Sequence, residues 1–426
     1  MSILDLDKVD LDAPMFDPAA FSIGEDEAEL NALARRLGKG RFAGRAAEYD
    51  RDARFPTENY GEMRNAGLLG LCIPREDGGL GAGYRAYMTT AAEIGRYCGA
   101  TALTYNMHVC SCLWTGPLLD DLNDLKMSEA DRAGHNRRRA IHYARIVKDG
   151  AIYAQPFSEG GGAAAGAAPF STQAQRVEGG WRINGRKIFA SLSGSADYYG
   201  ILCGEVRPGQ RPAWRDTMYI AVPANAPGVE VVGDWDPLGM RGTVSRTLLL
   251  KDVLVDDDAA LMPPGVYYQA AARWPHMFMT LTPTYMGIAQ AAFDFTVQYL
   301  RGEIPGTGPE KRRKFATKQV AIAQMFVMLQ QTKALWFQAI SEARADPAKE
   351  QVLRAYAAQY TVMENSNALC QLAIRTCGGQ SMLKTLPLER LYRDSRCGSL
   401  MLPWTAEICL DRIGREALYE PGEADD

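Results

Sequence analysis

The pattern of hydrophobic positions divides the chain into three blocks. Apolar residues recur at helical spacing from Glu25 to about Val147, and they do so again in long segments from about Gly265 to Ile413. Between these two blocks, apolar and polar residues alternate in short runs, which is the pattern of half-buried β-strands. The order of helices, strands and helices predicts an α+β protein.

We place the domain boundaries where the pattern changes. Residues 1–22 show no sustained period and are expected to form an N-terminal arm. The expected units that follow are a helical domain over 23–150, a β-domain over 151–260 and a second helical domain over 261–426. A chain of 426 residues is long enough for two or three such domains.

Glycines mark the expected end of the first helix and the expected turns of the β-domain. The apolar stripe that begins after Glu25 is expected to stop at Gly38 and Gly40. In the β-domain, the stretch FSTQAQRVEGGWRINGRKIF is interrupted by Glu-Gly-Gly at residues 178–180 and by Asn-Gly at residues 184–185. Both interruptions predict hairpin turns, because glycine tolerates the positive φ that tight turns require.

The strand that ends this stretch carries a candidate binding surface. Strict alternation places Phe189 and Ser191 on one face of the sheet and Ala190 on the other. An aromatic ring beside a hydroxyl suits a flat ligand with a polar edge, whereas the alternative is a core phenylalanine beside a surface serine. The run of small residues over 160–168 is expected to form a loop that lets a ligand approach the backbone closely.

Composition and charge narrow the classes of function. The chain is 47% hydrophobic with a net charge of -4, so no general attraction to nucleic acid or to an anionic membrane is expected. We find neither a long apolar span nor a leader pattern, and we therefore expect a cytoplasmic protein without membrane insertion. The nine cysteines lack paired metal-ligand spacing and only four histidines occur, so free thiols and no metal site are expected.

Five motifs follow one another along the chain: CIPREDGGLGAG, AQPFSEGG, GGWRINGRKIFAS with ADYY, DPLGMRGTVSRTLLLKDVLV, and TCGGQSMLKTLPLERLYRDSR. Over roughly residues 25–415, this succession resembles the acyl-CoA dehydrogenase family of flavoproteins. The resemblance implies an N-terminal helical domain, a central β-barrel-like domain, a C-terminal four-helix bundle and bound FAD. It also implies a homo-oligomer, a tetramer or at least a dimer, whose flavin site takes residues from a neighbouring subunit.

The resemblance assigns flavin contacts to named residues. In the Lys-x-aromatic-x-Ser strand, which begins at Lys187, Phe189 would pack on the isoalloxazine and Ser191 would reach its N5 edge. Phe157 and Ser158 would meet the pyrimidine edge. A further set would contact the flavin from the C-terminal half, partly across a subunit boundary: Arg312 or Arg313, Gly378, Gly379, Thr405 and Glu407.

Other residues of the motifs are expected to be structural. Arg241 is expected to order a loop beside the substrate channel. Arg393 and Asp394 are expected to form an ion pair at a helix start. His108 lies on a helix that the resemblance places beside the acyl pocket, and the alternative is a histidine whose hydrogen bonds are satisfied within the helical domain.

The expected catalytic base is missing. The resemblance implies α,β-desaturation of an acyl-CoA thioester in fatty acid metabolism, with electrons passed to an electron-transfer flavoprotein. This chemistry needs a carboxylate to remove the α-proton. The two places where the family carries that Glu fall at Leu402 or Pro403 and at Met277, and Glu407 and His276 are the nearest titratable candidates. A displaced base is one interpretation; a flavin-dependent monooxygenase, oxidase or desulfinase-like enzyme, or a non-catalytic flavin-binding paralogue, are the alternatives.

Overall fold

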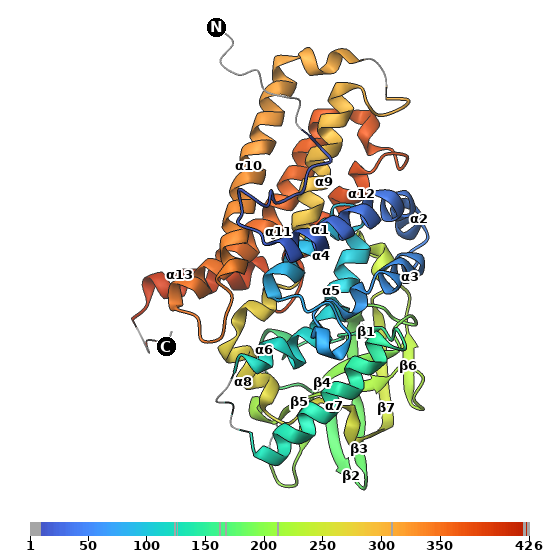
Figure 1. The fold of residues 1–426 in the computed structure, drawn as a ribbon, viewed down its shortest axis with the longest axis vertical. Coiled ribbons are helices and arrows are strands. Elements are labelled where there is room, and N and C mark those ends of the chain that lie inside the picture. Colours follow the sequence, from blue (N-terminus) through green and yellow to red (C-terminus); the bar gives the residue numbers. More distant parts are fainter. Residues whose placement is uncertain are drawn as a thin grey trace.

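The computed structural model describes residues 10–122, 125, 127–161, 163–166, 168–210, 213–307, 310–420 and 423. Helices from the two ends of the chain surround one end of a β-sheet (Figure 1). The long C-terminal helices form the upper part, the N-terminal helices cross the middle, and the sheet lies at the lower end. The expected α+β architecture is confirmed.

The helices before the sheet build the middle of the molecule. Among them, α4 and α5 are buried along nearly their whole length, whereas α7 runs along the outside of the sheet (Figure 1). The bounds of these helices are α1 (Glu25–Leu37), α2 (Ala43–Arg51), α3 (Thr57–Asn65), α4 (Tyr84–Gly95), α5 (Gly99–Thr115), α6 (Pro117–Asp120) and α7 (Glu129–Val147).

The predicted stop at Gly38 and Gly40 is confirmed in part: α1 ends at Leu37, with Gly38 as its C-cap, but the chain stays helical through both glycines. Gly38–Phe42 form a π-helical turn that leads from α1 directly into α2. A Cβ added to Gly38 would lie 2.1 Å from Cδ2 of Tyr97. This glycine therefore permits close packing against the Tyr97 ring, and packing outweighs its weak helix propensity.

The eight-stranded sheet has the order β6-β7-β3-β2-β4-β5-β8, and β1 pairs with β4. Pairing is parallel for β1–β4 and β2–β4 and antiparallel for the other neighbours. The strands are β1 (Tyr153–Ala154), β2 (Gln173–Val177), β3 (Gly180–Ala190), β4 (Tyr198–Val206), β5 (Thr217–Pro223), β6 (Val229–Val232), β7 (Arg246–Asp256) and β8 (Ala260–Met262).

One of the two predicted hairpin turns exists. Residues 178–179 connect β2 to β3, as expected. The Asn-Gly pair at 184–185 is not a turn, because it lies inside β3 at a register shift against β7. The Asn184 side chain exchanges two hydrogen bonds with Asp252 on β7, and Thr172 occupies the space where a Cβ of residue 185 would lie. Gly185 therefore permits both the bulge in β3 and the close approach of Thr172.

The C-terminal helices form the upper bundle and a projecting end. Helix α9 is buried and packs against α4, α10, α11 and α12. It begins near the sheet and ends at the top of the bundle (Figure 1). The bounds are α8 (Val266–Arg273), α9 (Thr282–Arg301), α10 (Ala316–Ser341), α11 (Lys349–Cys377), α12 (Leu388–Arg396) and α13 (Ala406–Leu418).

Buried charges fasten the N-terminal segment to these helices. Arg96 on α4 donates to the carbonyl of Ala13, and Lys333 on α10 donates to the carbonyl of Met15, at 2.9 Å each. The Met15 N–H donates to Glu93 Oε1 at 2.8 Å. Backbone groups of an extended segment need such partners when they are buried. The segment therefore joins α4 to α10.

In the described part of the chain, no helix is long and apolar enough to cross a membrane. All nine cysteines have free thiols, and eight of them are buried.

Candidate flavin and substrate cavity

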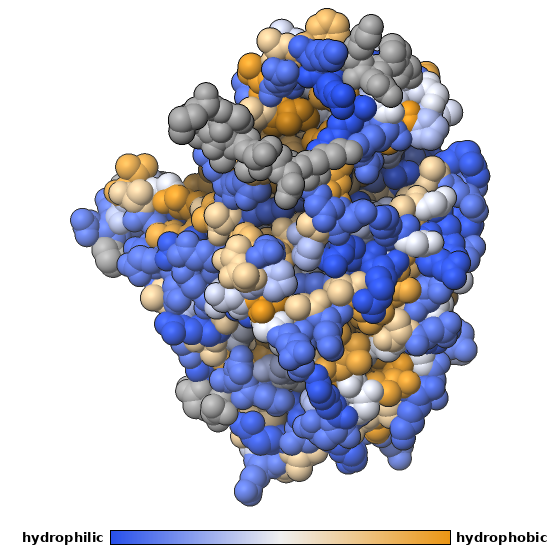
Figure 2. All heavy atoms as spheres, turned by 45° about the horizontal axis from the view of Figure 1, so that its top comes forward, coloured by the Kyte–Doolittle hydropathy of each residue, from blue (hydrophilic) through white to orange (hydrophobic). Residues whose placement is uncertain are grey.

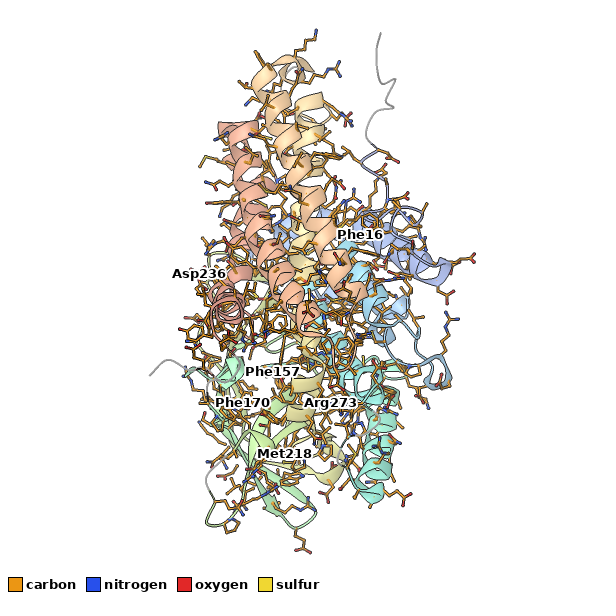
Figure 3. The ribbon with its side chains drawn as sticks, turned by 90° about the vertical axis from the view of Figure 1, so that its left-hand side faces the viewer. Phe16, Phe157, Phe170, Met218, Asp236 and Arg273 are labelled. Carbon is orange, nitrogen blue, oxygen red and sulfur yellow. The ribbon has the colours of Figure 1, made fainter. Side chains whose placement is uncertain are left out.

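A cavity of about 380 Å³ lies where the sheet meets the helices. Figure 3 labels two of its residues, Phe157 and Phe170, at this level of the molecule. One wall comes from β3 and the loop that precedes β2, another from α5, and the rest from the 235–245 segment, Tyr267, residues 277–281 just before α9 and residues 397–403. This volume falls at the small end of the range for ligand pockets in proteins.

The end of β3 faces the cavity, as expected, but a bulge changes its alternation. Ile188, Phe189 and Ser191 all line the cavity. The pairing of β3 with β7 shifts register between Lys187 and Ala190, and Phe189 has a φ of 51°, in the left-handed region. Phe189 is therefore turned outward, with 66% of its surface exposed. A non-glycine residue held in this region points to a functional constraint.

A row of hydroxyls continues the same wall. Ser191 Oγ lies 2.8 Å from Ser245 Oγ, which lies 2.7 Å from Thr243 Oγ1. All three residues line the cavity beside the open Phe189 ring. A flat group with polar edges, such as the isoalloxazine of a flavin, fits a surface that combines an exposed ring with hydroxyls.

Phe157 and Ser158, the residues expected at the pyrimidine edge of the flavin, also line the cavity, and two contacts from β3 hold their segment in place. The Ile188 N–H donates to the Ser158 carbonyl at 2.8 Å. Lys187 Nζ lies 2.5 Å from Glu159 Oε1, and neither side chain is more than 2% exposed. Lys187 thus turns away from the cavity and supports the predicted flavin-facing segment from behind.

The helical wall of the cavity is apolar and aromatic. It contains Trp114 from α5, whose ring lies 5.6 Å from that of Phe157 and 6.1 Å from that of Tyr267 on α8. His108 on the same helix faces away from the cavity. Its Nε2 lies 2.9 Å from the Leu69 carbonyl, and its Nδ1 accepts the Tyr153 N–H at 3.0 Å. His108 is thus the satisfied structural histidine of the two alternatives.

Both places where the resemblance expects a catalytic glutamate open onto the cavity, but each holds an apolar residue. Met277, Leu402 and Pro403 line it. Among the described residues that form the lining, none is Asp, Glu, His, Lys or Arg. The thiol of Cys110 is present, but burial raises its pKa to about 12. At neutral pH this cavity therefore offers no group that readily accepts a proton.

The two displaced-base candidates are not brought to the cavity. His276 is fully buried and is not part of the lining, and neither ring nitrogen has a hydrogen-bond partner in the described chain. Burial lowers the pKa of His276 to about 4. Glu407 is exposed in the first turn of α13. Thr405 caps that helix by accepting the Ile408 N–H at 3.3 Å.

The remaining predicted flavin ligands lie together at the other end of α9. Arg312 stacks over the Tyr299 ring at 4.5 Å, and Tyr299 donates to Gln380 Oε1 at 3.1 Å. Gln380 directly follows Gly378 and Gly379. From Leu281 at the cavity to Tyr299, α9 rises about 27 Å at 1.5 Å per residue. One flavin ring cannot meet both places through contacts of this chain alone.

Two structural expectations have different outcomes. Arg241 orders the loop at the cavity edge, because it donates to the Asp50 carbonyl at 2.8 Å and its own carbonyl accepts from Trp235 Nε1 at 2.9 Å. The expected pair of Arg393 with Asp394 is wrong. Arg393 pairs with Asp50 at 2.6 Å, whereas Asp394 accepts the Met240 N–H. Helical geometry points these neighbours in different directions.

Sequence reasoning missed Trp114, Gln155, Trp235 and Tyr267, which all line the cavity. Their contribution depends on how α5, α8 and the loop after β6 meet. Aromatic residues at these places have no local sequence signal that distinguishes them from core residues. The order of motifs could direct attention to α5, but not to individual residues on it.

Comparison with known proteins identifies the fold family. The acyl-CoA dehydrogenase N-terminal, middle and C-terminal domains match residues 24–119, 156–253 and 279–400. The human mitochondrial short-chain specific acyl-CoA dehydrogenase is 28% identical over 353 residues, which are 82% of this chain and 80% of the relative. The putative acyl-CoA dehydrogenase YdbM of Bacillus subtilis (strain 168) is 26% identical over 88% of this chain and 93% of its own.

One solved structure with the same fold is that of a monooxygenase. Dibenzothiophene monooxygenase TdsC from Paenibacillus sp. A11-2 superposes with a TM-score of 0.75 at 21% identity, over 92% of this chain and 97% of that one. The same protein has been solved with FMN bound. The three matched domains, in the order and at the places that the motifs indicate, together with the open wall for a planar cofactor, show that this chain belongs to the acyl-CoA dehydrogenase family of flavin-dependent oxidoreductases.

Proposed function

We propose that this protein is a flavin-dependent monooxygenase that acts on a small, planar, uncharged substrate. The observation that carries the proposal is the cavity lining, in which both family positions for the base are apolar and the described residues include no carboxylate or imidazole. Monooxygenation does not require removal of an α-proton from a thioester. The flavin, when bound and reduced, would supply two electrons for O₂; one oxygen atom would enter the substrate, and the other would leave as water with two protons from solvent.

The residues of this chain would then bind and orient the flavin and the substrate and shield them from water. Phe189, Ser191 and the segment at Phe157 and Ser158 would hold the flavin ring, while the aromatic wall at Trp114 would face the substrate. An apolar wall on that side would keep water away from the reacting atoms. The absence of cations from the described lining also favours an uncharged substrate.

Acyl-CoA desaturation is the second candidate, and the curated relatives favour it. The human short-chain specific acyl-CoA dehydrogenase is 28% identical to this chain. In this alternative the protein would form a 2,3-enoyl-CoA and pass electrons to an electron-transfer flavoprotein. Its weakness is the missing base, because positioned proton transfer typically contributes about 10²–10⁴-fold to a rate.

Two measurements on the FAD-loaded protein separate the candidates. Anaerobic titration with butyryl-CoA, octanoyl-CoA and isobutyryl-CoA is expected to leave the oxidised flavin spectrum unbleached. With flavin reduced by NADH and a flavin reductase, indole and naphthalene are the first substrate probes, and ¹⁸O from ¹⁸O₂ is expected in the product. Bleaching by an acyl-CoA with an enoyl-CoA product overturns the monooxygenase. Flavin binding without either activity would indicate a non-catalytic protein and also contradict the proposal.

We further propose that the protein is a homo-oligomer in which the far end of α9 serves the flavin of a neighbouring subunit. One guanidinium nitrogen of Arg312, Nη1, is buried without a partner among the described residues, and Gly378 and Gly379 leave open space in place of a Cβ. Exposed apolar side chains nearby on α10 suit a subunit contact: Val320, Phe326 and Val327. Figure 2 shows hydrophobic residues among hydrophilic ones on the face that includes this end.

Sedimentation of the FAD-loaded protein tests the assembly. A dimer or tetramer is expected, and Arg312→Ala should weaken FAD binding while leaving the helical content unchanged. Arg313→Ala is the matched control, because Arg313 is an exposed neighbour of the same charge. A monomer that retains a full complement of FAD contradicts the cross-subunit contact.

A further inference from the structure

The cavity contains an unused hydroxyl on its substrate side. Tyr267 lines the cavity from the first turn of α8 and is 9% exposed. Within the described part of the chain, no hydrogen bond reaches its hydroxyl, although burial raises the pKa of Tyr267 and keeps the proton in place at neutral pH. A buried tyrosine ordinarily finds a hydrogen-bond partner. The open donor at this place points to a ligand.

The fold holds this tyrosine rigidly. Gly265 has a φ of 78° and donates its N–H to the Thr217 carbonyl at 2.9 Å, which ties the start of α8 to β5. A Cβ at Gly265 would lie 2.6 Å from the Arg215 carbonyl oxygen, so only glycine fits there. The Tyr267 ring then rests 6.1 Å from Trp114 and 6.2 Å from Phe157, between ring centroids. The Tyr267 ring is therefore held by the anchored start of α8 and by packing against two aromatic rings.

A second polar group lies near the same wall. Gln155 lines the cavity and donates its Nε2 to the Tyr219 hydroxyl at 2.8 Å. Its Oε1 has no hydrogen-bond partner in the described chain. The Tyr219 and Tyr267 rings lie 6.4 Å apart. The aromatic wall thus presents one donor and one acceptor, while the other cavity-lining amide, Asn106, uses its side chain on Tyr87 and Thr284.

We propose that the Tyr267 hydroxyl is the polar anchor of the substrate, donating a hydrogen bond to an oxygen of a planar, uncharged molecule whose ring packs on Trp114. This inference rests on the proposed function for its substrate class, and it adds the residue that selects for an oxygen. An apolar pocket that contains one buried donor binds a matching acceptor and disfavours the analogue without it, because the donor then loses water without compensation.

A binding cycle with two matched probes tests the anchor without requiring turnover. 1-Indanone carries a carbonyl oxygen where indane carries a methylene. Each is titrated into the FAD-loaded wild type and into Tyr267→Phe, with the visible spectrum of bound flavin as the readout. The ratio of the dissociation constants of indane and 1-indanone is expected to be about tenfold larger for the wild type than for Tyr267→Phe. A tenfold difference corresponds to the contribution of one buried hydrogen bond. Flavin content and unfolding temperature should stay unchanged in the variant.

Tyr268→Phe is the matched control, because it makes the same chemical change at the next residue, which is 46% exposed and does not line the cavity. It should keep the full preference for 1-indanone. An equal preference in wild type and Tyr267→Phe overturns the anchor, and so does an equal loss in both variants or failure of both probes to bind. Bleaching of the flavin by an acyl-CoA would instead refute the proposed monooxygenase reaction. The binding comparison of 1-indanone and indane could still be interpreted.

Discussion

Replacing Lys187 by methionine tests how the buried ion pair supports the flavin-facing segment. Lys187 Nζ contacts Glu159 Oε1 and the Leu202 carbonyl, and the side chains of the pair are 0% and 2% exposed. Methionine fills nearly the same volume without the charge. The substitution leaves the Glu159 carboxylate buried without its cation, next to Ser158 at the cavity.

The size of the effect follows from what remains around Glu159. Removing one partner of a buried ion pair costs about 3–5 kcal/mol. Glu159 keeps hydrogen bonds from Ser171 N–H, Ser171 Oγ and Thr172 N–H, at 2.6, 2.7 and 3.0 Å. These bonds still stabilise the carboxylate, so we expect a loss near 3 kcal/mol, the low end of that range. Flavin affinity should fall as well, because the 157–159 segment loses one of its two ties to β3.

An exposed pair in the same sheet provides the control. Lys251 and Glu230 join β7 and β6 with side chains 62% and 49% exposed, and Lys251→Met should cost at most about 1 kcal/mol. The free energy of unfolding in urea, followed by circular dichroism, and titration with FAD give the two readouts. If Lys187→Met and Lys251→Met lose equal stability, the buried pair does not hold the segment as argued. Adding Glu159→Leu to Lys187→Met should recover part of the loss.

The difference in stability between wild type and Lys187→Met is expected to depend on pH. Burial opposes ionisation of Glu159, but attraction to Lys187 and the hydrogen bonds outweigh it and lower its pKa in the native protein. The stabilisation from this carboxylate is therefore present above its unfolded pKa and is lost as the pH falls through the lower native value. Without Lys187, only the hydrogen bonds from Ser171 and Thr172 oppose the effect of burial, which favours the neutral acid. The difference between wild type and Lys187→Met should therefore shrink as the pH falls below the ordinary range of a glutamate, and a constant difference would contradict the assignment.

Two further predictions concern stability. Burial lowers the pKa of His108, His135 and His276 to about 4, so their stabilisation is complete above about pH 6.5 and is lost as the pH falls toward 4, by up to about 1.4 kcal/mol per pH unit for each histidine. Urea unfolding at several pH values should show this slope, and His108→Gln should reduce it; a flat profile between pH 6.5 and 5 would refute it. Phe16, labelled against the helices in Figure 3, is 2% exposed and packs on Trp336, so Phe16→Ala should cost about 3–5 kcal/mol. A loss below about 1 kcal/mol in the same unfolding assay would show that the N-terminal segment does not contribute to the core.

The sequence alone determined the architecture and singled out the strand whose end lines the cavity. Periodicity of apolar positions separates helices from strands because each element must bury one face, and this constraint is local. The order of motifs added the family, and with it Phe157, Ser158, Phe189 and Ser191, which all line the cavity. The order of motifs also showed that the expected catalytic base is missing, because Met277 and Pro403 occupy the positions where the family carries its glutamate.

Only the tertiary structure decided what depends on packing between distant elements. Gly38 is needed where the Tyr97 ring leaves no room for a Cβ, and the Asn-Gly pair at 184–185 lies in a bulge because Asp252 pairs with it from another strand. Arg393 finds Asp50, 343 residues away, rather than its neighbour. Tyr267 belongs to the cavity because α8 is tied to β5. Such contacts join residues far apart in the chain, and no local pattern encodes them; side-chain direction and close packing settle them only after the elements have come together.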